Sequence, residues 1–162
     1  ERYDELNEKL NLVLDVWDGE PNINLSLLGL VDIATPHIAG YSLQGREKGT
    51  LMIYQAFCQY FQIAPKFDMQ NALTKGAIMS LEPNPKFGRH RLIAKACHAI
   101  YNLAADDAKM RNVLSQDLIG GEFDLLRKHY VERDEFSTCK ITAGYKDLNA
   151  VGFANEGLVE AK

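Results

Sequence analysis

Leu12-Val13-Leu14-Asp15-Val16-Trp17 is the segment that best indicates the fold of the first part of the chain. It is a short apolar run rich in β-branched residues, and it ends at the turn residues Asp18-Gly19, which is typical of a buried strand. A second such run, Val31-Asp32-Ile33-Ala34, stops before Thr35-Pro36, and a helix is expected between the two runs, over Leu25–Leu30. A strand, a helix and a strand in this order predict a parallel pair, so the chain begins as an α/β fold.

The composition of the 162-residue chain is that of an ordinary globular protein. Apolar residues make up 46% and charged residues 25%, which excludes a disordered chain or a fibrous repeat. The net charge of -4 has the wrong sign for a protein whose main partner is a polyanion, so we expect no nucleic-acid partner. No apolar run is long enough to cross a bilayer, so we expect no membrane partner and a cytoplasmic location.

Disulfide and metal chemistry find little support in the sequence. The cysteines form no C-x-x-C pair and are odd in number, so we expect reduced thiols rather than a disulfide framework or a zinc ribbon. His98 lies beside Cys97, but no second pair has the spacing of metal ligands. We therefore predict no metal site and interpret His90, His98 and His129 as structural or exposed.

Helical periodicity returns from Gly49 to Ile63, where apolar residues recur at the spacing of one helix face and others lie beside them. We expect this helix to pack on more than one side. Its aromatic stripe is more often core or interface than a cofactor pocket. The stripe consists of Tyr54, Phe57, Tyr60 and Phe61.

The second part of the chain is predicted to follow a proline-containing linker over residues 64–89, with a domain boundary near residues 64–68 and strand structure around residues 77–81. Helices are then expected over 92–103, 107–114 and 123–130, and a strand over 138–143. This arrangement predicts an α+β domain. At the two ends, a short amphipathic helix is expected over residues 4–10 and a frayed polar tail over 155–162.

Three polar residues, Asp15, Glu20 and His37, lie at or just after the ends of the two predicted strands. A carboxylate beside an imidazole makes a general acid/base pair, because the carboxylate orients the ring and stabilises its protonated form. Spacing alone leaves plainer interpretations open. Glu20 is also typical of a turn residue before proline, Asp15 of a strand-end carboxylate that accepts a backbone N–H, and His37 of an exposed loop histidine.

The residues around these three resemble a known family. Residues 12–21, LVLDVWDGEP, and 32–42, DIATPHIAGYS, closely resemble the C-terminal signature of the NAD-dependent D-2-hydroxyacid dehydrogenases. The continuation to Thr50 and the later stretch 121–133, GEFDLLRKHYVER, are similar to the erythronate-4-phosphate branch of that family. The resemblance covers about residues 10–141 and is strongest at its two ends.

The resemblance implies a role for individual residues. His37 matches the acid/base that accepts the proton of the substrate's C2 hydroxyl, and Glu20 matches the carboxylate bound to its imidazole. Asp15 and Gly40 match contacts to NAD, and Tyr41 matches a substrate contact of the erythronate-phosphate branch. The implied small-molecule substrate is a phosphorylated 2-hydroxy acid, the implied cofactor is NAD, and the implied assembly is a homodimer.

Two parts of the family's machinery are missing from the sequence. No Gly-x-Gly-x-x-Gly loop occurs, and the match begins too late to include the arginine that binds the substrate carboxylate. The chain also begins at Glu1 without a methionine, so we interpret it as the C-terminal portion of a longer protein. Residues 1–63 are expected to be the end of a Rossmann-like cofactor domain with its exit helix, and residues 64–162 an α+β dimerisation domain. Alone, the chain should not catalyse.

Other functions remain open at this point. One is a D-2-hydroxyacid dehydrogenase of other specificity, which would keep Glu20 and His37 but make the Tyr41 match incidental. The other is a catalytically silent dimerisation module whose helices around 92–103 and 123–130 associate. The basic and aromatic run over residues 86–91 could contact a phosphate, but it is more typical of a solvated helix start.

Overall fold

The computed structural model describes residues 10–84, 86–114, 119–142 and 145–155 and divides the chain into two compact units. The first unit comprises Glu1–Ala39 and Leu103–Tyr130, and the second comprises Gly40–Asn102 and Val131–Lys162. Both units combine helices with a small parallel sheet, so the fold is mixed α/β. The expected division of the longer protein at residues 63 and 64 stays a prediction. The expected helix over residues 4–10 and nearly all of the predicted polar tail lie outside the described residues.

The first unit opens with the predicted strand, helix and strand. β1 (Val13–Leu14) pairs in parallel with β2 (Ile33–Ala34), with Val13 opposite Ile33, and α1 (Leu25–Leu30) connects them. The Asn24 side chain begins α1, because its Oδ1 accepts from the backbone N–H groups of Ser26 and Leu27 at 2.9 and 3.2 Å. The α/β order predicted for this part is confirmed.

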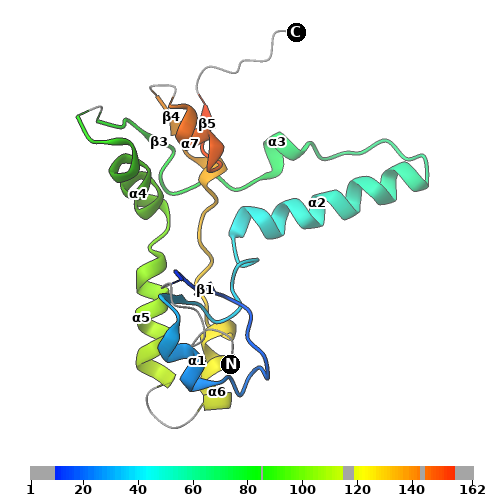
Figure 1. The fold of residues 1–162 in the computed structure, drawn as a ribbon. Coiled ribbons are helices and arrows are strands. Elements are labelled where there is room, and N and C mark those ends of the chain that lie inside the picture. The colour runs from blue at the N-terminus through cyan, green and yellow to red at the C-terminus, as the bar shows by residue number, and fades with distance from the viewer. Residues whose placement is uncertain (1–9, 85, 115–118, 143–144, 156–162) are drawn as a thin grey trace. The chain divides into compact units, whose positions relative to one another are not determined.

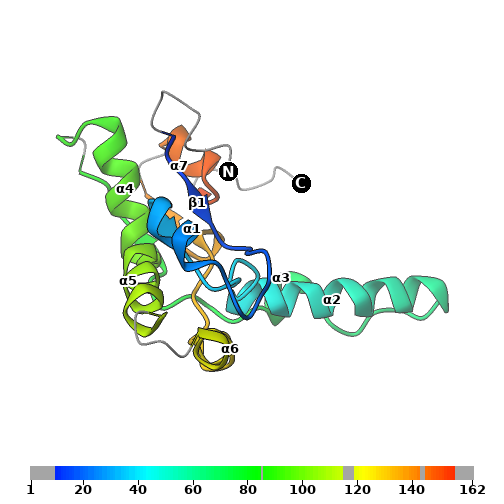
Figure 2. The same ribbon diagram turned by 60° about the horizontal axis from the view of Figure 1, so that its bottom comes forward.

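Two helices from later in the sequence complete the first unit. α5 (Leu103–Leu114) and α6 (Ile119–Lys128) lie side by side (Figures 1 and 2), and α5 also packs against β2. The helices predicted over 107–114 and 123–130 therefore exist, but both begin earlier than expected. The core of this unit is a cluster of buried side chains from all of these segments. Its members are Trp17, Ile23, Leu28, Val31, Ala34, Met110, Phe123 and Leu126.

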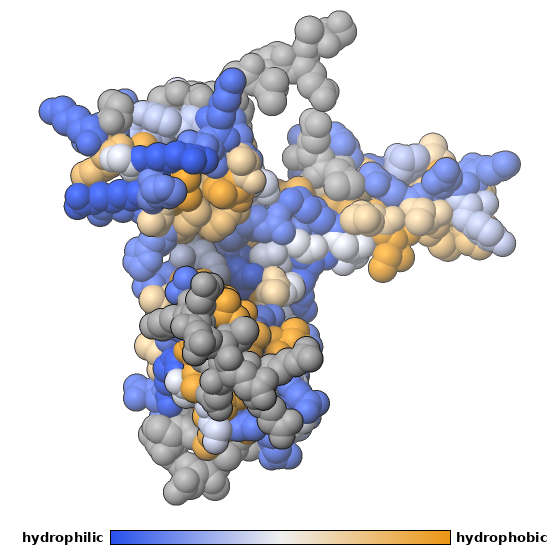
Figure 3. Space-filling view, viewed as in Figure 1, coloured by the Kyte–Doolittle hydropathy of each residue, from blue (hydrophilic) through white to orange (hydrophobic). Residues whose placement is uncertain are grey.

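The second unit begins with the longest helix of the described residues, α2 (Leu43–Tyr60), drawn in cyan in Figure 1. It starts before Gly49, the expected first residue. The expectation that it packs on more than one side is wrong for the described residues, because Phe57 is 53% exposed and Tyr60 is 81% exposed. Figure 3 shows hydrophobic side chains at the surface along this helix. Only Cys58 and Gln44 of α2 are buried. Of its apolar stripe, Tyr54 is half-buried against Phe67, whereas Phe57, Tyr60 and Phe61 are exposed among the described residues.

The remainder of the second unit surrounds a three-stranded parallel sheet. The strand order is β3 (Ser80–Leu81), β4 (Lys140–Ile141) and β5 (Ala154–Asn155). The segment expected as a linker therefore holds β3 as well as α3 (Met69–Ala72). The helical elements after it are α4 (Arg89–Ile100), the 3-10 turn η1 (Phe136–Thr138) and α7 (Lys146–Ala150).

A second core lies between this sheet and its helices. Leu92 and Ala96 of α4 pack with Ile141, Leu148 and other buried residues. All three cysteines are free thiols, as the sequence predicted; Cys58 and Cys139 are buried, and Cys97 is half-buried. Burial raises the pKa of the Cys97 and Cys139 thiols. None of the helices in the described part is long and apolar enough to cross a membrane.

Candidate functional site

The candidate site of the first unit is formed by the segments that follow β1 and β2. Because these strands are parallel, the residues after them lie at the same edge of the sheet. Asp15 follows β1 directly, Glu20 lies in the turn beyond it, and His37 lies shortly after β2. The structure therefore brings the three residues that the sequence singled out to one edge.

Glu20 and His37 form a direct pair. The His37 Nδ1 lies 2.9 Å from the Glu20 Oε2, and the Glu20 Oε1 accepts from the backbone N–H of Trp17 at 2.8 Å. A carboxylate can only accept, so the pair assigns the ring proton to Nδ1 and leaves Nε2 as an acceptor. The His37 side chain is 44% exposed, whereas that of Glu20 is 17% exposed. The imidazole can thus take a proton at Nε2 from a molecule at the surface while Glu20 binds Nδ1.

The backbone of His37 adopts an uncommon conformation. Its φ of 56° lies in the left-handed region, which non-glycine residues enter rarely and mostly where the surroundings enforce it. Asp15 supplies that constraint: its carboxylate accepts from the backbone N–H groups of Ile38 and Ala39 at 2.8 and 3.0 Å, and from the Thr35 hydroxyl at 2.6 Å. Asp15 therefore holds the loop that presents His37.

The turn that presents Glu20 is also fixed. Gly19 has a φ of 76°, which only glycine adopts readily, and its carbonyl accepts from the Asn22 N–H at 2.9 Å. The buried Trp17 donates from its Nε1 to the Thr35 carbonyl at 2.9 Å. This bond joins the segment after β1 to the segment after β2, so the two halves of the Glu20–His37 pair are built on connected backbone.

Glu20 remains a carboxylate although it is largely enclosed. Burial alone raises its pKa, but hydrogen bonds from His37 and Trp17 and the positive charges of His37 and Arg127 lower it further than burial raises it. The net effect is a Glu20 pKa below its ordinary value. A carboxylate that stays ionised is what an acid/base histidine needs to hold its ring and balance its charge.

Arg127 is a member of this site that the sequence analysis missed. It lies on α6, and its Nη1 lies 3.9 Å from the Glu20 Oε2. Its Nε is buried and has no hydrogen-bond partner among the described residues. No local pattern connects an arginine on a late helix with a turn after the first strand, so only the tertiary packing of α6 could reveal the pairing.

Gly40 and Tyr41 belong to the second unit. Gly40 is exposed, and a Cβ built on it would meet no atom within 4 Å. Tyr41 is half-buried, and its carbonyl accepts from the Arg133 N–H at 3.4 Å, next to an isolated bridge between Ser42 and Arg133. The cofactor and substrate roles implied for these two residues stay predictions. No group of three or more histidine, cysteine or acidic residues in the described part could hold a metal ion.

The chain matches a protein family and is similar to named proteins of known organisms. Residues 72–152 match a family described as "Domain of unknown function (DUF3410)". An erythronate-4-phosphate dehydrogenase of Marinomonas sp. (strain MWYL1) is 46% identical over 159 residues, which is 95% of this chain and 42% of the relative. The corresponding enzymes of Yersinia enterocolitica and Aeromonas salmonicida are 39% and 42% identical and are covered over 40% and 38% of their length.

The chain thus spans about two fifths of the length of the curated relatives that it matches. The resemblance stated from the sequence is confirmed over nearly the whole chain, because these relatives carry the name of the branch that the residues indicated. Since the matched residues make up half of the chain, the chain belongs to the DUF3410 family.

Proposed function

We propose that this chain is the C-terminal region of an NAD-dependent dehydrogenase that oxidises 4-phospho-D-erythronate at C2 to 2-oxo-3-hydroxy-4-phosphobutanoate, a step of pyridoxal phosphate biosynthesis. The observation that carries the proposal is the Glu20–His37 pair at 2.9 Å. The names and identities of the relatives support the substrate. In this proposal residues 1–63 belong to the end of a Rossmann-like cofactor domain with its exit helix, and residues 64–162 belong to a dimerisation domain.

The chemistry assigned to this chain is proton transfer. The free Nε2 of His37 accepts the proton of the C2 hydroxyl as the carbonyl forms, and the Glu20 carboxylate holds Nδ1–H and balances the positive charge that the ring gains. Asp15 fixes the loop of His37, so the imidazole is positioned before substrate binds. NAD, when bound, supplies the acceptor for the hydride that leaves C2.

The residues present fit the nicotinamide end of such a cofactor. The Asp15 Oδ1 accepts two hydrogen bonds and Oδ2 accepts one, so Oδ2 retains a lone pair for a carboxamide N–H. The open space at the Gly40 Cα allows close approach to the backbone there. We assign Asp15 and Gly40 to the cofactor and Tyr41 to the substrate, as the resemblance implies.

The decisive experiment is NAD reduction by the full-length protein that contains this chain. It is offered 4-phosphoerythronate beside glycerate, lactate and 3-phosphoglycerate, and the formation of reduced nicotinamide is followed by absorbance. Strong preference for 4-phosphoerythronate supports the proposal. Activity only on another 2-hydroxy acid would keep the Glu20–His37 chemistry but replace the substrate, and no activity on any of them would overturn both.

A homodimer is part of the same proposal. The exposure of α2 supports a dimer contact on that helix rather than on α4 and α6. In the helices that the sequence suggested for association, Leu92 and Ala96 of α4 and Phe123 and Leu126 of α6 are buried in the two cores, whereas Leu125 of α6 is 42% exposed. The exposed apolar stripe of α2 is the surface that supports association with further polypeptide. Sedimentation of the full-length protein measures the assembly.

A further inference from the structure

The second unit contains a cavity of about 520 Å³ whose lining includes neither Glu20 nor His37. Its positive charges come from three different segments: Lys48 on α2, Lys75 in the loop after α3, and Lys140 on β4. Hydroxyl-bearing residues also line it, and Leu73 and Met79 supply apolar surface. Its volume lies within the range of about 300–1,000 Å³ that is usual for small-molecule sites.

The walls of this cavity are fixed by interactions within the unit. The fully buried Gln44 donates from Nε2 to the Asp134 Oδ1 at 2.8 Å and accepts from the Glu135 N–H at 2.9 Å. Gly76 lies so close to Thr138 that a Cβ at this position would collide with the threonine side chain. The loop after α3 and the segment before β4 are thereby held together, so the cavity is formed before any ligand binds.

The carboxylates near the cavity accept hydrogen bonds from its walls rather than from its lysines, with one exception. Glu47 accepts from the Thr74 N–H at 2.8 Å, and Asp134 accepts from the Ala77 N–H at 2.7 Å. The exception is Lys48, which pairs with Glu135. Hydrogen bonds from Lys48 and Ser42, together with the charge of Lys48, lower the pKa of Glu135 despite its partial burial, so this carboxylate stays ionised and neutralises Lys48.

Two ammonium groups remain available. The Nζ atoms of Lys75 and Lys140 have no hydrogen-bond or ion-pair partner among the described residues, and neither has the hydroxyl of Ser80. Unpaired lysines and a hydroxyl around one preformed cavity are donors without acceptors. A ligand with several anionic oxygens would satisfy them together, and charge-assisted bonds of this kind are the stronger ones.

We propose that this cavity binds a small phosphate monoester, with its phosphate oxygens between Lys75, Lys140 and Ser80 and its carbon skeleton against Leu73 and Met79. These donors suit a small anion better than a polyanion, because the chain carries a net charge of -4 and would repel an extended nucleic acid. The proposal is independent of the dehydrogenase assignment, since none of these residues belongs to the Glu20–His37 site.

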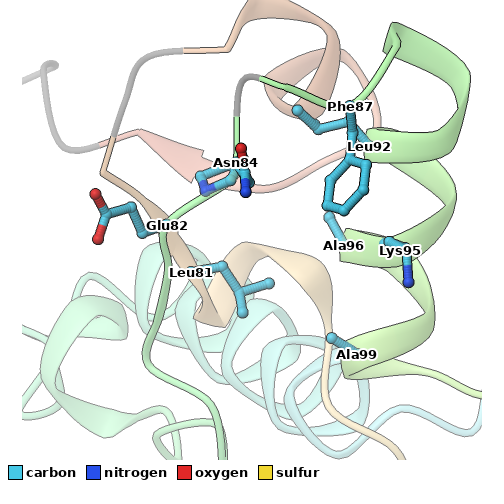
Figure 4. A pocket seen from close by; sticks show the side chains of 9 residues that line it. Leu81, Glu82, Asn84, Phe87, Leu92, Lys95, Ala96 and Ala99 are labelled. Carbon is cyan, nitrogen blue, oxygen red and sulfur yellow. The ribbon is translucent and has the colours of Figure 1, made fainter.

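A second cavity of the same unit lacks this chemistry. It has a volume of about 210 Å³ and lies between α4 and the segment after β3 (Figure 4). Its lining is mostly apolar, and its single lysine, Lys95, lies 5.8 Å from the centre of the Phe87 ring. Lys95 therefore serves as a matched control: it is an exposed lysine at a cavity of the same unit that should not hold a phosphate.

The test is calorimetric titration of the full-length protein with ribose 5-phosphate, with inorganic phosphate and with ribose as a phosphate-free probe. We expect saturable binding of ribose 5-phosphate, weaker binding of inorganic phosphate and none of ribose. The double variant Lys75→Gln/Lys140→Gln should weaken ribose 5-phosphate binding at this site at least tenfold. The control Lys66→Gln/Lys95→Gln, which removes the same charge from exposed positions of the same unit, should bind as the unaltered protein does.

A second pair of variants tests the cavity without removing a lysine. Met79→Glu places a carboxylate at the proposed ligand position, and Met52→Glu places one on α2; the two methionines are 61% and 62% exposed. Only Met79→Glu should weaken binding. Equal affinity in Lys75→Gln/Lys140→Gln and the unaltered protein, an equal loss in the control variants, or the same binding of ribose and ribose 5-phosphate would each overturn the proposal.

Discussion

Glu20 faces two side chains that carry or can gain positive charge, and they act on it in different ways. His37 shares a hydrogen bond with it at 2.9 Å, whereas Arg127 is a permanent charge at 3.9 Å with less direct geometry. The first fixes the imidazole, and the second helps to keep the carboxylate ionised when the imidazole is neutral. Because Arg127 keeps its charge, Glu20 has a cationic neighbour in either charge state of the imidazole.

Replacing His37 by alanine removes the proton acceptor and should lower turnover of the full-length enzyme by roughly 10²–10⁴-fold, the usual contribution of a positioned acid/base. The dimer should persist, because His37 is partly exposed at the strand ends. Steady-state rates and size-exclusion chromatography measure the two properties. His98→Ala, which alters an exposed histidine on α4, should leave both unchanged. Loss of the dimer with retained turnover would contradict the role given to His37.

Arg127→Met should lower the stability at neutral pH and make it depend less on acidic pH. A carboxyl whose pKa is lowered on folding contributes stability above its unfolded pKa, and this contribution is lost as the pH falls through its folded pKa. Without Arg127 the Glu20 pKa is lowered less, so a smaller contribution is present at neutral pH, a smaller one is lost on acidification, and the loss is complete at a higher pH. Denaturant unfolding at a series of acidic pH values measures this. Arg91→Met, at an arginine that stacks on Phe87, should leave the pH dependence unchanged.

The sequence predicted Glu20 and His37 as a pair because both follow strands whose parallel order places their ends together. Asp15 was predicted at the same edge, and the plainer interpretation of it, a carboxylate that accepts backbone N–H groups, is what the structure shows. The cofactor contact implied for Asp15 stays a prediction beside it. Arg127 was not predicted as a member of the site because its partner is distant in the chain, and a local pattern contains no information about such a contact.

Helix α5 supports the candidate site from behind through one arginine. Arg111 donates from Nη1 to the Leu28 carbonyl and from Nη2 to the Val31 carbonyl, each at 2.9 Å, so it satisfies carbonyls at the end of α1 and just beyond it. Its Nε donates to Asp107, which in turn accepts from the Ala34 N–H at 2.7 Å. This network ties α1 and β2 to α5 and so fixes the strand from which the loop of His37 departs.

Arg111→Met should destabilise the chain by about 1.5–3 kcal/mol, the usual range for hydrogen bonds to a charged group. The loss includes two carbonyls left without their donor and an Asp107 left without its cation. Lys109→Met changes an exposed cation on the same helix and should alter the free energy of unfolding by less than about 0.5 kcal/mol. Denaturant titration followed by circular dichroism compares the two, and similar losses would argue against the network.

Element types were predicted better than element boundaries. The strand, helix and strand at the start follow from local patterns, and so do α4 and the region of β3. α2 begins earlier than the pattern indicated because its first turns are held by distant partners: Gln44 binds Asp134, Arg46 pairs with Glu132 and Lys48 pairs with Glu135. Strands of two residues also lie below what alternation can detect, since one period of the pattern is already two residues.

Over the whole chain, the described residues form two separate cores and, on α2, one exposed apolar stripe. The cores stabilise the chain itself, whereas the stripe is available for contact with other polypeptide. Phe123 is completely buried in the first core, whereas Phe57 of α2 contacts Phe61 with ring centres 4.6 Å apart but is 53% exposed. Aromatic residues of the same type thus occupy opposite environments. The sequence favoured packing, as core or interface, for the stripe that contains Phe57, because periodicity identifies an apolar face without identifying what covers it.

This contrast gives a prediction for a matched pair of substitutions. In this chain Phe123→Ala should cost about 3–5 kcal/mol of unfolding free energy, since it leaves a cavity in a closed core, whereas Phe57→Ala should cost less than about 1 kcal/mol. The same pair in the full-length protein reports on α2 directly, because covering its stripe would raise the cost of Phe57→Ala toward that of a buried residue. Denaturant titration of both proteins measures the four values. A large cost of Phe57→Ala already in this chain would contradict the exposed position of α2, and a small cost in both proteins would contradict the association proposed for its stripe.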